Sequence, residues 1–217
     1  MFSFDIETIP NLDLVDTLPE PEVALGSLKD PEKISAKIAE AKAKQVLGMG
    51  LSPFTGRICS AAYAGKYHGY KSIDEISDAA EIDLINSVLE KFVTTQTETP
   101  HVITWNGFEF DMRFLFIRAM LLKIQLPSGC LGLSQFTKKY SRFPHTDLAK
   151  EFSGWGQKIY KLDHIAGWLL GKKKADHDFS KFIELINTGK SSEIGIYNLV
   201  DAELTLEIYE KAAPYLF

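Results

Sequence analysis

Apolar and polar residues alternate, or short apolar runs occur, in five stretches of the chain. In residues 2–9, FSFDIETI, the side chains are apolar at even positions and polar at odd positions as far as Glu7. This period of two predicts a half-buried strand. Further strands are predicted at 57–64, 66–73, 101–106 and 144–148.

Helices are predicted where apolar residues recur every three or four positions. Residues 78–94 show this spacing most plainly. Other helices are predicted at 110–122, 162–170 and 192–212, the last one ended by Pro214. A helix is also predicted at 31–47, because Pro31 stands at its first position and the stretch is rich in Ala, Lys and Glu. The order of elements predicts an α/β fold, a mixed sheet flanked by helices. Residues 10–55 would form a helical insertion after the first strand.

Length and composition limit the class of protein. With 217 residues, of which 45% are hydrophobic and 24% charged, the chain has the size and balance of one globular domain spanning 1–217. A largely disordered chain, a coiled coil and a collagen-like chain are excluded. No apolar run approaches the ~20 residues of a membrane span, and MFSFDIET lacks the features of a signal peptide. We expect a cytoplasmic protein with two buried free thiols, Cys59 and Cys130.

The net charge of −5 hides an uneven distribution along the chain. Residues 1–111 carry a net charge of −9, residues 112–174 carry +9, and residues 175–217 carry −5. Aromatic residues lie among the charges of the basic middle block, which ends in Lys172, Lys173 and Lys174. Such a segment suits a polyanion whose bases can stack. The alternative is that these lysines and arginines are solvated faces of helices and loops.

Two carboxylates stand two residues apart on the first predicted strand. Asp5 and Glu7 share a face because side chains on a strand alternate. Two adjacent carboxylates repel each other, and burial adds to the cost of charging them. A divalent cation would remove this cost. The alternative is an edge strand with one wet face.

Two other carboxylates occupy positions that are ordinary when each is taken alone. Asp111 follows the strand and the Asn106-Gly107 turn, where it could simply cap a helix. Tyr197 and Asp201 lie one turn apart on the last helix, a spacing that is usually only structural. Asp5, Glu7, Asp111 and Asp201 together, however, provide four carboxylates. Carboxylates are ligands for hard, oxygen-preferring metals. No cluster of histidines or cysteines suggests zinc.

Three motifs in this order resemble those of the DEDD exonucleases of the ribonuclease H-like superfamily. FDIET resembles the first motif, NGFEFD (106–111) the second, and YNLVD (197–201) the third. A tyrosine four residues before the last aspartate marks the tyrosine subgroup, whereas the histidine subgroup has a histidine at the place of Ile196. Within the subgroup, the chain is most similar to stand-alone relatives of the proofreading domain of family-B DNA polymerases.

This resemblance implies a two-metal 3′→5′ exonuclease. Asp5, Glu7 and Asp201 would hold one Mg²⁺ or Mn²⁺, and Asp5 would bridge to a second ion with the help of Asp111. Because a phenol with its ordinary pKa of about 10 is a poor base, we expect the metal to acidify the attacking water and Tyr197 to position it. Neighbours of the acids would touch the terminal nucleotide: Thr8, Asn106 and Phe110, the last of which could instead be core.

Single-stranded DNA, or a frayed DNA 3′ end, is the expected substrate. RNA is the rival, since no motif reveals a contact to a 2′-hydroxyl. A non-catalytic nucleic-acid-binding module and a structure-selective endonuclease are further alternatives, although no acid of the three motifs is missing. A polymerase does not fit in 217 residues, so replication or repair proteins would act in trans. The lysines 172–174 are expected to bind the strand.

Overall fold

A mixed five-stranded sheet forms the centre of the molecule in the computed structural model, which describes residues 1–173 and 178–217. The strands are β1 (Phe2–Pro10), β2 (Gly56–Gly65), β3 (Gly69–Ser72), β4 (Val102–Thr104) and β5 (His145–Asp147), in the order β3-β2-β1-β4-β5. β1 pairs antiparallel with β2 and parallel with β4, while β4 pairs parallel with β5. The predicted α/β class with a mixed sheet is confirmed.

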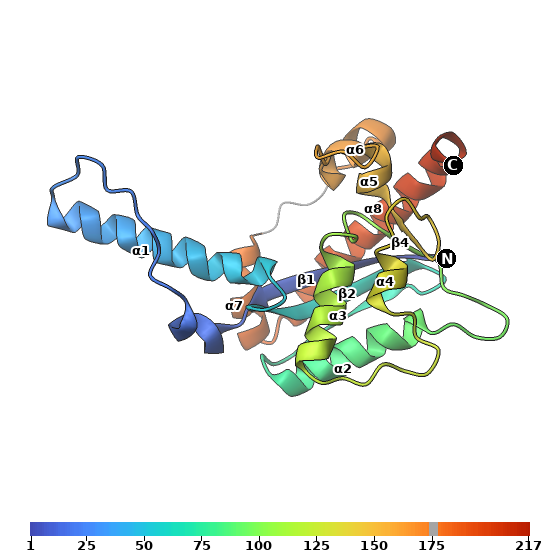
Figure 1. Ribbon diagram of the computed structural model, residues 1–217, viewed down its shortest axis with the longest axis horizontal. Coiled ribbons are helices and arrows are strands. Elements are labelled where there is room, and N and C mark those ends of the chain that lie inside the picture. The colour runs from blue at the N-terminus through green and yellow to red at the C-terminus, as the bar shows by residue number, and fades with distance from the viewer. Residues whose placement is uncertain (174–177) are drawn as a thin grey trace.

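Helices cover both faces of this sheet (Figure 1). On one face, α2 (Asp78–Leu89), α3 (Asp111–Leu121) and the short α4 (Leu133–Phe136) pack on the main hydrophobic core. On the other face lie α5 (Leu148–Phe152), α6 (Leu162–Leu170) and the long α8 (Ser191–Leu216). α7 (Phe182–Asn187) precedes α8 and contacts it.

Small residues let α8 lie very close to the sheet. Ala62 and Ala64 of β2 face Ala202 of α8 in one buried cluster. A Cβ on Gly195 would lie 1.9 Å from the ring of Tyr70 on β3, so only glycine fits there. The buried hydroxyl of Ser3 donates to the carbonyl of Ala202 at 2.6 Å. This bond joins β1 to α8 next to Asp201, which brings residues about 200 positions apart together.

A bulge interrupts the pairing of β1 and β2 beside the acidic residues. Glu7 pairs with Ser60 and Thr8 with Ile58, so Cys59 has no partner of its own on β1. The extra residue lies on β2, where the consecutive residues Ile58 and Cys59 both belong to the main core cluster. Bulges re-aim side chains locally, and this one separates Asp5 and Glu7 from the last residues of the strand.

The insertion after β1 forms an arm that projects from the sheet (Figure 1). It contains the 3₁₀-helix η1 (Leu12–Thr17), the helix α1 (Pro31–Gly48) and the 3₁₀-helix η2 (Met49–Leu51). We use the name arm for the part of this insertion that follows η1, residues 18–51. Asp30 caps α1 by accepting a hydrogen bond from Glu32 N at 3.0 Å, and Pro31 opens the helix, as its preferred first position predicts. No residue of α1 is buried.

Several sequence-based boundaries were wrong. α8 continues through Pro214 to Leu216. A proline so near the end of a helix removes only one backbone hydrogen bond, and only two helical residues follow it. The predicted third strand, 66–73, shrinks to β3 since Gly65 and Gly69 adopt positive φ angles. The helix predicted over 78–94 ends at Leu89 and continues as the 3₁₀-helix η3 (Glu90–Phe92).

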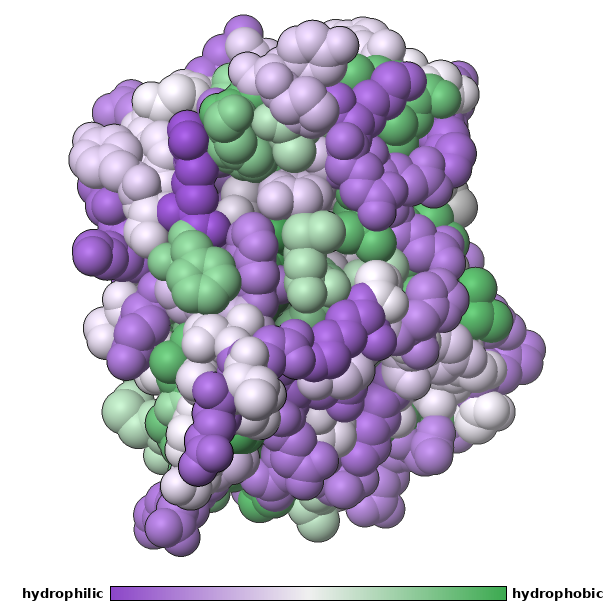
Figure 2. Space-filling view, turned by 90° about the vertical axis from the view of Figure 1, so that its right-hand side faces the viewer, coloured by the Kyte–Doolittle hydropathy of each residue, from purple (hydrophilic) through white to green (hydrophobic). Residues whose placement is uncertain are grey.

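Other elements escaped prediction because of their length. α4, α5 and α7 have four to six residues, too few to show a helical period. Cys59 is buried as expected, but Cys130 is only half-buried. Among the helices of the described residues, none combines the length and apolarity needed to cross a bilayer. On the face opposite the arm, hydrophobic residues are scattered among hydrophilic ones (Figure 2).

Candidate active site

Three carboxylates from two elements meet at the centre of the molecule. Asp5 and Glu7 come from β1, and Asp201 comes from α8. One oxygen from each carboxylate can be chosen so that all three lie within 4.8 Å of one another. Glu7 and Asp201 are buried and Asp5 is partly exposed. Three converging carboxylates, one of them open to solvent, fit the coordination preference of Mg²⁺, Mn²⁺ or Ca²⁺.

Asp111 lies beside this cluster and is held by the backbone of β1. Its Oδ1 accepts a hydrogen bond from Ile6 N, the amide between the two acids of the strand, at 3.1 Å. Burial raises the pKa of Asp111 to about 7, and the charges of Asp147 and Asp201 act in the same direction. In the metal-free protein the carboxyl is therefore half-protonated near neutral pH. A cation bound nearby would favour its ionised form.

Asn198 is a site residue that the sequence analysis missed. Its Nδ2 donates to Asp5 Oδ2 at 2.5 Å, and its Oδ1 accepts from Ser60 Oγ at 3.1 Å. Ser72 Oγ donates in turn to Ser60 Oγ at 3.1 Å. This buried chain from β3 through β2 and α8 fixes one oxygen of Asp5. The available signal was the spacing, because Asn198 lies three residues before Asp201 and thus on the same helix face.

A tight turn between β4 and α3 places Asn106, Phe110 and Asp111. Asn106 adopts a φ of 68°, a left-handed conformation that asparagine tolerates better than most residues. Asp147, at the end of β5, accepts hydrogen bonds from Asn106 N and Phe108 N, both at 2.9 Å. The sequence analysis also missed Asp147, since its role appears only once β4 and β5 pair.

Buried polar groups fix the floor of the same turn. Burial lowers the pKa of His145 to about 4, so its ring is neutral at pH 7. Its Nδ1 lies 2.6 Å from the Phe136 carbonyl and must donate to it, so Nε2 accepts from Thr104 Oγ1 at 2.8 Å. Thr104 Oγ1 in turn accepts from Gly107 N at 3.1 Å. A Cβ on Gly107 would lie 2.4 Å from that oxygen, which explains the glycine.

Tyr197 is buried one turn before Asp201 on α8. Its ring makes edge contacts with Phe179 and Phe182, with centroids 6.0 and 6.4 Å away. These contacts hold the ring from the side of α7. Tyr197 and Asp201 lie four residues apart on α8 as predicted, but only Asp201 is among the residues that line the cleft in front of the acids.

The acids open into a cleft of about 660 Å³. Its lining includes the four acids and the predicted nucleotide contacts Thr8, Asn106 and Phe110. Thr8 Oγ1 donates to the carbonyl of Gly50 at 2.6 Å, so this hydroxyl also holds the base of the arm. The arm itself lines the other side of the cleft through residues that the sequence analysis did not single out: Lys44, Leu47, Gly48, Gly50 and Leu51.

The basic block of residues 112–174 is less available than its net charge suggests. Arg118 is buried and bonds Glu81 through two nitrogens, and buried Lys150 pairs with Glu109 at 3.0 Å. Lys172 bonds Glu207 of α8 at 2.6 Å. Lys172 and exposed Lys173 are not among the residues that line the cleft. Lys174 lies outside the described residues.

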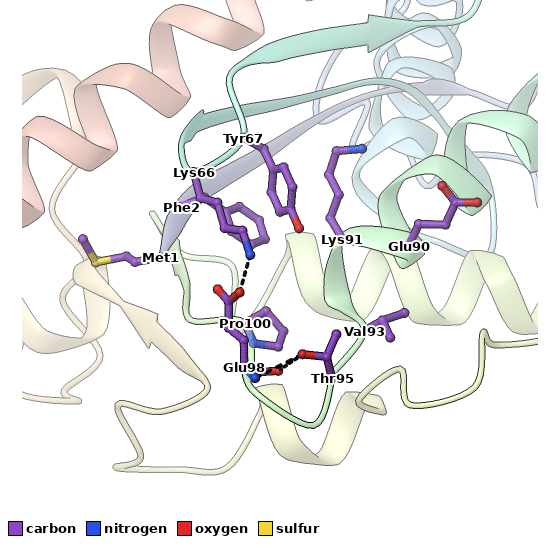
Figure 3. Close-up of a pocket in the computed structure, with 10 residues that line it drawn as sticks. All are labelled: Met1, Phe2, Lys66, Tyr67, Glu90, Lys91, Val93, Thr95, Glu98 and Pro100. Atoms are coloured by element: carbon purple, nitrogen blue, oxygen red, sulfur yellow. Dashed lines mark hydrogen bonds and ion pairs between the residues drawn. The ribbon is translucent and has the colours of Figure 1, made fainter.

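A second hollow, of about 260 Å³, lies at the opposite end of β1 around Met1, Phe2 and Tyr67 (Figure 3). Lys66 and Glu98 face each other across it at 2.5 Å. Their charges neutralise each other, so this hollow lacks the converging acids that distinguish the cleft.

Comparison with known proteins agrees with this geometry. Residues 55–214 match the family described as "Predicted 3'-5' exonuclease related to the exonuclease domain of PolB". The chain is 29% identical over 143 residues to DNA polymerase 1 of Sulfolobus acidocaldarius and 30% identical over 146 residues to DNA polymerase 1 of Saccharolobus solfataricus. Each match covers 60% of this chain but only 16% of the polymerase.

A solved structure resembles the whole chain. The family B DNA polymerase of the archaeon Pyrobaculum calidifontis aligns with a TM-score of 0.60 and 16% identity, over 98% of this chain and 24% of the polymerase. At this identity the likeness supports the fold. Since the family match spans most of the sequence, the chain belongs to the family of predicted 3′-5′ exonucleases related to the exonuclease domain of PolB.

Proposed function

We propose that the chain is a metal-dependent 3′→5′ exonuclease that degrades single-stranded DNA or frayed DNA 3′ ends to nucleoside 5′-monophosphates. The observation that supports this most is the convergence of Asp5, Glu7 and Asp201 within 4.8 Å in an open cleft. DNA is the preferred substrate because the relatives of known name are DNA polymerases.

The acids are proposed to hold two Mg²⁺ or Mn²⁺ ions. Asp5, Glu7 and Asp201 supply ligands for one ion, while Asp5 and Asp111 serve the second. Such a pair of ions, when bound, activates a water and stabilises the leaving oxygen of a phosphodiester. Asn198 keeps one oxygen of Asp5 oriented through the 2.5 Å hydrogen bond, as outer residues commonly do for metal ligands.

Tyr197, which packs on the cleft residue Phe179, and several residues of the cleft lining are proposed to place the substrate. The hydroxyl of Tyr197 orients the attacking water, and the packing of its ring against Phe179 and Phe182 limits its motion. Phe110 contacts the terminal base or sugar. Asn106 lines the cleft beside Phe110 and contacts the terminal nucleotide. Because the Thr8 hydroxyl donates its proton to the carbonyl of Gly50, its oxygen can only accept a hydrogen bond from the nucleotide.

Digestion of an end-labelled oligonucleotide tests this proposal. A 5′-labelled strand should shorten step by step with Mn²⁺, whereas a 3′-labelled strand should release labelled mononucleotide at once. EDTA should stop both reactions. Internal cuts as first products would indicate an endonuclease, and faster loss of an RNA strand of the same sequence would reassign the substrate. Binding without hydrolysis under every metal condition would indicate a non-catalytic module.

A further inference from the structure

We propose that the end of the arm, at Lys44, Leu47 and Leu51, is a binding surface for the bases of the last nucleotides of a single strand. This inference rests on the proposed function and extends it to a part of the chain outside the family match, which begins at residue 55. The arm wall, as we call these three residues, lies across the cleft from Phe110 and the acids.

The base of the arm is fixed relative to the acids. Thr8, the residue after Glu7, donates to Gly50 at 2.6 Å, and Asn11 N donates to Thr55 O at 2.9 Å. A Cβ on Gly50 would lie 3.3 Å from the carbonyl carbon of Ile9, so η2 packs tightly on β1. Because these contacts connect η2 directly to the catalytic strand, the arm wall has a defined position in the cleft.

The arm wall exposes apolar side chains in a cleft that also holds four carboxylates. Leu47 is 49% exposed and Leu51 is 73% exposed. Phe179, 51% exposed, lines the same cleft. A further hollow of about 320 Å³ continues between the arm and α7 and shares Leu47 and Phe179 with the cleft. A ligand must therefore offer flat apolar surfaces next to an anionic, metal-binding group, and a strand of bases and phosphates does so.

Lys44 adds a positive charge to this surface. It lies one turn before Leu47 and hence on the same face of α1. Lys42, on another face, pairs with Glu20 at 2.9 Å, and Lys37 donates to the carbonyl of Ala24. Among the residues that the structure describes, no carboxylate pairs with Lys44. The other lysines thus hold the arm together, while Lys44 is available to a phosphate.

Binding of 5′-fluorescein-labelled oligothymidylate in EDTA, where hydrolysis should be absent, tests the arm wall by fluorescence anisotropy. The double variant Leu47→Ala/Leu51→Ala should bind roughly tenfold more weakly than the wild type, because it loses apolar surface that the bases would bury. The matched control is Met120→Ala/Leu121→Ala, which removes exposed apolar side chains from the far end of α3 and should bind normally.

A second oligonucleotide separates base contact from a general change of shape. If its last three nucleotides are abasic, the arm variant and the wild type should bind it equally. The inference would be overturned if the variant bound the intact oligonucleotide as tightly as the wild type does. It would also be overturned if the variant lost the same affinity for the intact and the abasic oligonucleotide. A wild type that neither binds nor degrades single strands would instead contradict the proposed function itself.

Discussion

The two sides of the cleft are built in opposite ways. The acid side consists of β1, α3 and α8. Its acids are buried, apart from the partly exposed Asp5, and are held by hydrogen bonds such as Asn198 to Asp5 and Ile6 to Asp111. The arm side consists of α1 and η2, where no helix residue of α1 is buried and leucines face solvent. α3 and α8 belong to the family match, whereas β1 with Asp5 and Glu7 lies before it, as the arm does.

This difference suggests a division of tasks. Chemistry requires ligands held within a fraction of an ångström, which buried hydrogen-bonded side chains provide. Recognition of a strand of any sequence needs only apolar surface and positive charge. We therefore expect changes on the acid side to act on catalysis and metal binding, and changes on the arm side to act on substrate affinity.

The largest effect is expected from removing a metal ligand. Asp201→Asn should lower turnover by roughly 10³-fold or more, because metal-assisted hydrolysis depends on the charge that this carboxylate contributes. Thermal unfolding in EDTA should show equal or higher stability, since repulsion with Asp5 and Glu7 is relieved. Glu203→Gln, on the exposed side of the same helix, is the control and should be active. Full activity of Asp201→Asn would remove the metal assignment.

A pH-dependent effect of comparable size is expected from Asp111. Burial raises its pKa to about 7, so between pH 5 and pH 8 the folded metal-free protein holds a proton that the unfolded chain has released. The contribution of Asp111 to the free energy of unfolding therefore falls as the pH rises through this range, by roughly 2–3 kcal/mol. Urea unfolding in EDTA at several pH values should show this loss as the difference between the wild type and Asp111→Asn.

Asp111→Asn should abolish that pH-dependent loss, whereas Asp16→Asn, on the exposed η1, should keep it. His145 contributes in the opposite sense over this range, because its pKa is lowered to about 4 in the folded protein, whereas an unfolded histidine, with a pKa of about 6.5, releases its proton there. Comparing variants cancels its contribution. An unchanged slope in Asp111→Asn would mean that Asp111 is ionised in the metal-free protein.

Tyr197→Phe should slow turnover by roughly 10- to 10³-fold, the scale of one positioned hydrogen bond in the transition state. Metal affinity should stay the same, because the hydroxyl is assigned to water rather than to metal. Tyr215→Phe, 88% exposed on the same helix, provides the control. Equal turnover of Tyr197→Phe and wild type at saturating metal would reduce Tyr197 to core packing.

A smaller loss, roughly 10- to 100-fold in Mn²⁺ affinity, is expected for Asn198→Ala. The substitution frees Asp5 Oδ2 to rotate, although it leaves every ligand in place. Calorimetric titration with Mn²⁺ should detect this change, while substitution of the exposed Asn86 of α2 by alanine should leave binding as in the wild type. Unaltered affinity in Asn198→Ala would show that packing alone orients Asp5.

The smallest effects concern phosphate contacts. Lys44→Ala should flatten the slope of log K against log salt by about 0.7, the value for one contact with a single strand. Lys33→Ala, exposed further out on the arm, should leave the slope unchanged. Substitution of Lys172 and Lys173 should change it less than Lys44→Ala does, because Lys172 is already paired with Glu207. If substituting these two lysines changed the slope more than Lys44→Ala does, the strand would instead pass near the end of α6.

The comparison also shows which features the sequence could predict. The spacing of Asp5 and Glu7 on one strand, and of Tyr197 and Asp201 on one helix, is local geometry and survives in the structure. The role of Asn198 depends on a chain through β2 and β3, and the role of Asp147 depends on the pairing of β4 with β5. Such contacts between distant residues leave no periodic signal.

The position of the arm is a further feature that the sequence could not predict. Pro31 and the Ala/Lys/Glu-rich segment predicted α1 correctly, but its position over the cleft follows from the packing of Gly50 and Thr8. Conversely, the charge of residues 112–174 predicted a basic surface, whereas folding pairs Arg118 and Lys150 with acids from other segments. Net charge along a chain does not say which charges fold against each other.

Anomalous diffraction from crystals soaked in Mn²⁺ would locate bound metal ions directly. We expect two peaks about 3.5–4 Å apart, the first among Asp5, Glu7 and Asp201 and the second between Asp5 and Asp111. In Asp201→Asn crystals the first peak should weaken or vanish. Mn²⁺ bound elsewhere, with no density at the three carboxylates in an enzyme that is active under the same conditions, would contradict this metal assignment.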